Sequence, residues 1–85
     1  MVQFSHTVKD SAGIHARPAG ALVKIAKESN CSVTLKKGDK SADCKKIFTV
    51  MALGVKCGDA VTVEVTGEDE TVLAKTIQTF MEQNL

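Results

Sequence analysis

The 85-residue sequence predicts an α+β fold, an open-faced β-sandwich in which three helices cover one face of a four-stranded antiparallel sheet. Two observations support this prediction. Four segments alternate between apolar and polar residues, which is typical of strands that bury one face only. Between and after them come segments whose apolar residues recur at helical spacing or cluster in a short run. The predicted order of elements is β-α-β-β-α-β-α.

Length and composition indicate one soluble domain over residues 1–85, without room for a second core. Hydrophobic residues make up 44% and charged residues 25%, and the formal net charge of +1 does not indicate a nucleic-acid or membrane-surface binder. No apolar run approaches the roughly 18 residues of a membrane span, and the N-terminus lacks a signal-peptide core. We therefore expect a cytoplasmic protein with no direct membrane insertion.

The first strand is predicted over residues 2–8, with Val2, Phe4, His6 and Val8 on its buried face. His6 is interpreted as a structural histidine whose hydrogen bonds are satisfied. A helix follows over residues 18–29, in which apolar residues recur at helical spacing.

The next two strands form a hairpin. Residues 31–36 alternate again, and Gly38-Asp39 suits the centre of a two-residue turn with glycine first. This register places Leu35 opposite Ala42 and Val33 opposite Cys44, so that apolar residues meet on one face. A turn one residue earlier would instead set Leu35 against a lysine. Cys44 is therefore predicted to lie in the core.

The remaining elements are a short helix of one or two turns within residues 45–54, a strand over 61–67 and a final helix capped by Asp69. The final helix carries a predicted apolar stripe of Val72, Leu73, Ile77, Phe80 and Met81.

The cysteines are odd in number and form no Cys-x-x-Cys pair, which argues against a disulfide framework or a zinc site. Cys31, Cys44 and Cys57 are expected to be reduced thiols that serve as small apolar residues. No metal site and no cofactor are predicted.

The stretch SAGIHARPAG, residues 11–20, is the strongest functional signal. Gly13 permits a turn, and Pro18 suits the first turn of a helix because it lacks an N–H. His15 would then lie beside the free N–H groups of a helix N-terminus, which together with the helix dipole attract anions. Arg17 adds a cation whose donors match phosphate oxygens.

Such a setting favours a neutral imidazole, which has a free lone pair and can attack phosphorus without a metal or a general base. The residues thus indicate a site that accepts a phosphoryl group on His15 and gives it away again. The ordinary alternative is that His15 is a capping or solvent-exposed residue. Spacing alone leaves both open.

The motif GIHARPAG resembles the active-site motif of the HPr family, the histidine-containing phosphocarriers of the bacterial phosphoenolpyruvate-dependent sugar phosphotransferase system. The likeness extends over the whole chain and includes KKIFTVMALGV and VTVEVTGEDE. It implies that His15 is phosphorylated through Nδ1, that Arg17 steadies the phosphoryl group and that Pro18 opens the helix. It implies no cofactor.

The resemblance also implies a docking surface for two partners, enzyme I as the phosphoryl donor and sugar-specific IIA domains as acceptors. Ile47, Phe48 and Met51 fall where relatives present an apolar patch, although apolar residues on a short helix are more often core. Gly20, Lys24 and Lys27 lie on the same docking helix. A carrier that exposes one face to two partners is expected to be a monomer. Because His15 would be modified covalently and then discharged by another protein, we expect a phosphoryl carrier and not a stand-alone enzyme.

Two positions depart from the family pattern. Many relatives carry Ser or Asn where this chain has Ala12, so a polar contact to the phosphoryl group is in doubt, with Ser11 as a substitute. Lys46 occupies the place of the regulatory serine of many Gram-positive relatives, and a lysine cannot be phosphorylated by the same ATP-dependent kinase. The resemblance therefore implies a carrier that lacks regulatory serine phosphorylation.

Two other classes of protein are alternatives to a phosphocarrier. A regulatory HPr paralogue would act by protein binding without transfer, but such proteins can lose the histidine and this chain keeps His15. A small α+β metal chaperone would need a Met-x-Cys-x-x-Cys loop before the first helix, where this chain has SAGIHARPAG.

Overall fold

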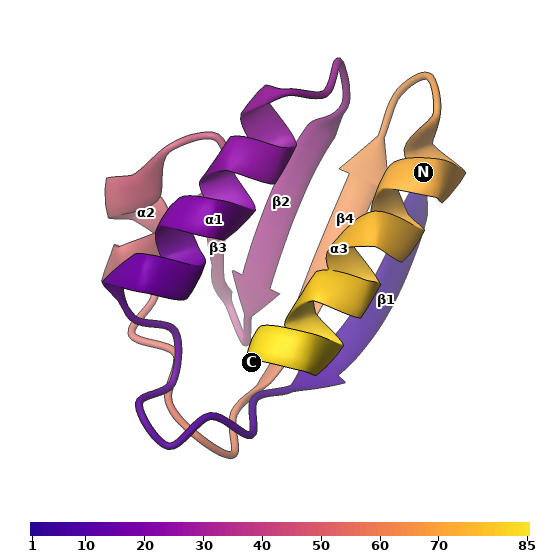
Figure 1. Cartoon of the computed structure of the whole chain (residues 1–85). Helices are drawn as coiled ribbons and strands as arrows, with labels where there is room; N and C mark the ends of the chain where they lie inside the picture. Colours follow the sequence, from indigo (N-terminus) through magenta and orange to yellow (C-terminus); the bar gives the residue numbers. More distant parts are fainter.

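The computed structural model describes all residues 1–85 and shows four strands and three helices in the predicted order (Figure 1). They are β1 (Val2–Thr7), α1 (Ala16–Lys27), β2 (Ser32–Lys37), β3 (Lys40–Asp43), α2 (Ile47–Ala52), β4 (Ala60–Thr66) and α3 (Glu70–Asn84).

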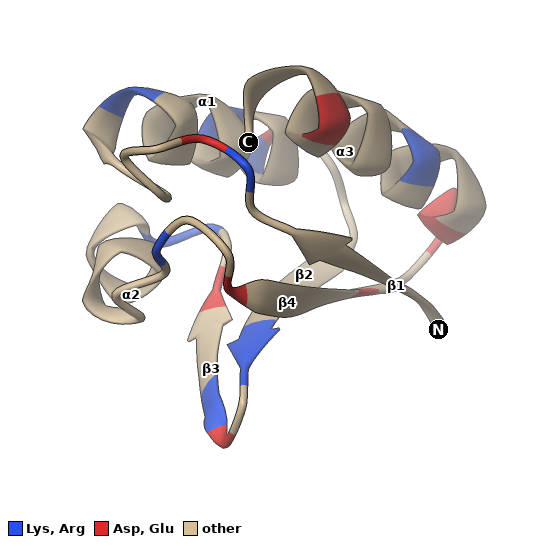
Figure 2. Cartoon of the chain, turned by 90° about the horizontal axis from the view of Figure 1, so that it is seen from below, with Lys and Arg blue, Asp and Glu red and all other residues tan.

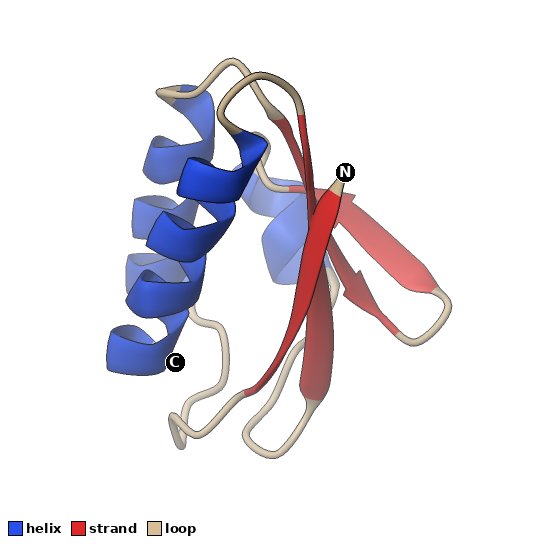
Figure 3. Cartoon of the chain, turned by 90° about the vertical axis from the view of Figure 1, so that its right-hand side faces the viewer, coloured by secondary structure: helices blue, strands red, loops and turns tan.

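The strands form one antiparallel sheet in the order β1-β4-β2-β3. The helices lie together on one side of this sheet and leave its other side uncovered (Figure 3). The side chains at the centre of the resulting core are large and fully buried, among them Leu22 of α1, Leu35 of β2 and both Ile77 and Met81 of α3. The predicted open-faced β-sandwich is confirmed.

The hairpin register is also confirmed. Leu35 pairs with Ala42, and the Cys44 N–H donates a hydrogen bond of 2.9 Å to the Val33 carbonyl. Gly38 has φ +57° and is the only one of the two turn residues with positive φ, as a turn with glycine first requires. Cys44 is buried, and burial, followed by the nearby Asp43 charge, raises the pKa of its thiol to about 12. This thiol is an inert core group.

Helix α1 begins two residues earlier than predicted, so that Pro18 is its third residue. The first N–H groups of any helix lack an intrahelical acceptor, and a proline therefore fits throughout the first turn. The first strand ends one residue early, at Thr7, although Val8 is buried as predicted.

Four predictions about single side chains were wrong. Asp69 precedes α3, but its backbone is left-handed at φ +59° and its side chain caps no N–H. Val72 is 68% exposed because the buried residues of α3 follow the phase of Ala74 and Ile77. His6 is half-buried on β1, and its buried Nε2 has no hydrogen-bond partner. Cys57 is a free thiol, but it is exposed and does not pack as a small apolar residue.

Two loops at one end of the sheet pack directly on each other. We call residues 8–15 the first loop and residues 53–59 the supporting loop. Val8 exchanges backbone hydrogen bonds with Gly58 and Asp59, and the Ile14 N–H donates to the Val55 carbonyl at 3.1 Å. Gly13 lies within this contact at φ +67°, where an added Cβ would come within 2.4 Å of the Val55 oxygen. The first loop is therefore held in one shape up to the start of α1.

This packing predicts different costs for alanine at two glycines that share a positive φ. A Cβ added at Gly38 meets no atom within 4 Å. Gly38→Ala should therefore lower the free energy of unfolding only by the cost of a left-handed backbone, about 1–2 kcal/mol. Gly13→Ala adds the clash with the supporting loop and should lower the free energy of unfolding by about 1–3 kcal/mol more. Urea unfolding followed by circular dichroism measures both variants. Equal losses would show that the two loops are not tightly packed.

Candidate functional site

His15 is the residue that precedes α1, and its backbone is extended, with φ −112° and ψ −179°. Its carbonyl accepts the first helical hydrogen bond, from the Ala19 N–H at 3.0 Å. Its side chain makes no capping bond and is 44% exposed. The imidazole is thus held at the helix entrance by its backbone, with its ring open to an incoming group.

The N-terminus of α1 offers donors without a competing acceptor. No side chain caps the helix, and no acidic residue lies in its first turn. Because Pro18 has no N–H, the free donors nearest His15 are the backbone N–H groups of Ala16 and Arg17. Arg17 is exposed, and its guanidinium takes part in none of the ion pairs of the chain. An anion beside His15 would meet two backbone donors and a free cation.

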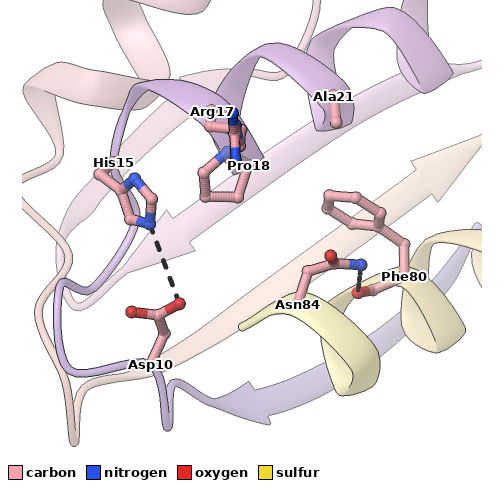
Figure 4. A pocket seen from close by; sticks show the side chains of 7 residues that line it. All are labelled: Asp10, His15, Arg17, Pro18, Ala21, Phe80 and Asn84. Atoms are coloured by element: carbon pink, nitrogen blue, oxygen red, sulfur yellow. Dashed lines mark hydrogen bonds and ion pairs between the residues drawn. The ribbon is translucent and has the colours of Figure 1, made fainter.

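A carboxylate lies on the other side of the ring, and the sequence analysis missed it. The Oδ2 atom of Asp10 is 3.8 Å from His15 Nε2 (Figure 4). The Oδ1 atom of the same carboxylate accepts a 2.8 Å hydrogen bond from the Ala12 N–H. A sequence signal was present, since Asp followed three residues later by Gly is typical of a turn that folds back on itself.

His15 and Arg17 line one shallow hollow of about 170 Å³ between the first loop, α1 and α3 (Figure 4). Its lining residues are Asp10, His15, Arg17, Pro18, Ala21, Phe80 and Asn84. The contribution of α3 was not predicted, because no local pattern reports which helix packs beside the first loop.

The three apolar residues singled out on α2 differ in their burial. Phe48 is 85% exposed and Met51 is 38% exposed, whereas Ile47 is half-buried and packs against the core. The Ile47 side chain lies over Gly20 of α1, where an added Cβ would be 3.9 Å from its Cδ1. α1 and α2 thus present a continuous surface that is apolar at its centre.

Basic residues surround this surface. Lys24 and Lys27 are exposed in the last turn of α1, and Lys46 is exposed as the residue that precedes α2. Figure 2 shows basic positions along α1 and on the segment that enters α2. Lys45 is not free in the same way, because its ammonium group lies 3.5 Å from the Ser29 carbonyl and donates to it.

The arrangement suits nucleophilic chemistry on an anion at His15. No group of three His, Cys, Asp or Glu side chains is placed to hold a metal ion, and none of the helices is long and apolar enough to cross a membrane. The site is open to solvent and therefore lends itself to reaction with a group presented by another protein.

Comparisons with known proteins agree that the chain is similar to HPr phosphocarriers. Residues 2–83 match the family model described as the PTS HPr component phosphorylation site. The chain is 33% identical over 81 residues to the phosphocarrier protein HPr of Mycoplasma capricolum, covering 95% of this chain and 91% of that protein. A solved structure of a Mycoplasma histidine-containing phosphocarrier superposes with a TM-score of 0.93 at 32% identity, covering 96% and 93% of the two chains.

A larger relative is the multiphosphoryl transfer protein of Xanthomonas campestris. It is 31% identical over 80 residues, which are 94% of this chain and 10% of that protein. The same unit thus occurs within a longer protein whose name describes phosphoryl transfer.

The exposure of Phe48 predicts that this side chain contributes little to folding. Phe48→Ala should change the free energy of unfolding by less than about 0.5 kcal/mol. Ile77→Ala, which truncates a fully buried side chain, should cost about 2–5 kcal/mol. Urea denaturation compares the two variants. A loss for Phe48→Ala as large as that for Ile77→Ala would assign the phenyl ring to the core and not to an interaction surface.

Proposed function

The chain belongs to the HPr family of phosphocarriers of the phosphotransferase system, and from this premise we propose that His15 carries the phosphoryl group, received from phospho-enzyme I and passed to sugar-specific IIA domains. The observation on which the proposal depends most is the position of His15 at the open N-terminus of α1. Arg17 and the backbone donors beside it are the proposed phosphoryl-binding groups.

In the proposed transfer, the lone pair of His15 Nδ1 attacks the phosphorus of the donor phosphohistidine. The new N–P bond forms as the donor N–P bond breaks, and the electron pair of that bond returns to the donor nitrogen. The phosphoryl oxygens then face the N–H groups of Ala16 and Arg17 and the Arg17 guanidinium. Discharge to an acceptor is the same displacement in reverse, so no metal or cofactor is required.

Pro18 has a structural part in this site. It is buried in the first turn of α1 and sets the backbone there without adding an N–H. The polar side chain that many relatives place before the glycine of this motif is absent, since Ala12 contributes only its backbone N–H to Asp10. Ser11 is exposed and its hydroxyl makes no hydrogen bond within the chain, so it remains available as a substitute contact beside those of α1.

The proposed docking surface consists of Gly20, Lys24, Lys27, Lys46, Ile47, Phe48 and Met51. Its apolar centre supplies the area that a transient complex buries, and the half-buried Gly20 lets α1 and α2 meet closely there. The surrounding lysines favour partners with an acidic surface and speed their encounter in a salt-dependent way.

Phosphorylation by the donor tests the carrier role directly. Incubation with a bacterial enzyme I, Mg²⁺ and phosphoenolpyruvate should add one acid-labile phosphoryl group, seen in the intact mass. The control His15→Ala should add none. No adduct on folded protein, with an enzyme I that phosphorylates another carrier, would favour a regulatory paralogue that acts by binding.

Lys46 carries the second part of the proposal, the absence of kinase-based regulation. A phosphoserine at the start of α2 would place a charge of roughly −2 beside Phe48 and repel acidic partners. Lys46 lies at that position and brings a positive charge instead. The protein should therefore stay competent for transport when a serine-directed kinase is active.

A bifunctional HPr kinase with ATP should leave the wild-type mass unchanged, because no serine stands at the start of α2. Lys46→Ser should gain one acid-stable phosphate in the same reaction. A phosphoserine on the wild-type chain, for example on the exposed Ser41 of β3, would contradict the prediction.

A further inference from the structure

Asp10 is held in place by one bond to its carboxylate and two bonds to its backbone. Its Oδ1 atom accepts the Ala12 N–H at 2.8 Å, its backbone N–H donates to the Leu85 oxygen at 3.0 Å, and its carbonyl accepts the Gly13 N–H at 2.9 Å. These bonds tie it to the turn of the first loop and to the end of α3. The bond to Oδ1 restricts the rotation of the carboxylate and therefore the direction of its second oxygen.

That second oxygen, Oδ2, is turned toward His15 and lies 3.8 Å from Nε2 (Figure 4). The side chain of His15 is 44% exposed and that of Asp10 is 32% exposed, so solvent screens the pair only in part. Among the side chains that line the hollow, Asp10 is the only carboxylate. The Oδ1 atom serves the turn of the first loop, and Oδ2 is left to act on the imidazole.

A neutral imidazole carries its proton on one nitrogen and a lone pair on the other. An ionised carboxylate can only accept hydrogen bonds, so it favours the tautomer with the proton on the nitrogen that faces it. We propose that Asp10 is a positioning residue for His15, which holds the proton on Nε2 and so leaves the lone pair on Nδ1.

This inference rests on the proposed function and adds a residue to it. When Nδ1 attacks the phosphorus and the N–P bond of the donor breaks, Nε2 of His15 keeps its proton and the imidazole ring gains positive charge. The Asp10 carboxylate lies beside the nitrogen that retains the proton, where it stabilises that charge. At 3.8 Å the interaction is electrostatic, and it tightens toward a hydrogen bond as the ring becomes charged.

The test is Asp10→Asn in the full chain. The asparagine amide oxygen still accepts the Ala12 N–H, but an NH₂ donor now faces Nε2. We expect ¹⁵N NMR of the neutral ring to show the Nε2–H tautomer in the wild type and a shift toward the Nδ1–H tautomer in the variant. Phosphorylation of His15 by phosphoramidate, a small donor that needs no partner protein, should slow by roughly tenfold.

Asp43→Asn is the matched control. The Asp43 Oδ1 atom accepts the Lys45 N–H at 2.9 Å in a turn of the same kind as that of Asp10, but its carboxylate pairs with no histidine. This variant should keep the wild-type tautomer of His15 and its reaction rate with phosphoramidate.

Two results would overturn the inference: a wild-type ring with its proton on Nδ1, or a folded Asp10→Asn variant with the wild-type tautomer and rate. The first result is read on the unmodified protein and depends on neither the folding of a variant nor any donor. Failure of the proposed function would look different, since the wild type would then show the Nε2–H tautomer but accept no phosphoryl group from enzyme I.

Discussion

The contact between the first loop and the supporting loop is the constraint on which the site depends. Gly13 lies so close to the Val55 carbonyl that no side chain fits between the two loops, and its positive φ turns the backbone toward α1. The bond from Ile14 to Val55 holds the residue before His15. Since the loop ends at His15, the residue before α1, its shape decides where the imidazole lies relative to the helix N-terminus. The sheet and core make this possible by anchoring both loops at one end of β1 and β4.

The second feature of the design is the separation of folding from recognition. The core is complete without the outer face of α2, since Val50 is buried while Phe48 points to solvent. The exposed phenyl ring beside free lysines is the reason why we propose this face as the docking surface. A carrier has to release each partner after transfer, and a small apolar centre with a charged rim suits brief complexes.

Most of the fold could be predicted because its signals are local. Alternation identified the strands, and the pairing of Leu35 with Ala42 followed from the one hairpin register that keeps apolar residues on one face. His15 could be placed at the start of a helix because Pro18, three residues later, predicts the first helical turn. The predictions that failed concern contacts between elements, which depend on the tertiary structure. Val72 belonged to the apolar residues of α3, and only the packing of that helix decides that it faces outward. Asp10 lies five residues before His15, and only the folded loop brings their side chains together.

In the proposed carrier, the N-terminus of α1 holds the phosphoryl group on His15. Heteronuclear NMR of the phosphorylated, ¹⁵N-labelled protein tests it most directly, since it identifies the bonded nitrogen and the amides that respond. We expect ³¹P–¹⁵N coupling to Nδ1 of His15 and large downfield shifts of the Ala16 and Arg17 amide protons. Coupling to Nε2, or amide shifts confined to residues outside the start of α1, would contradict it.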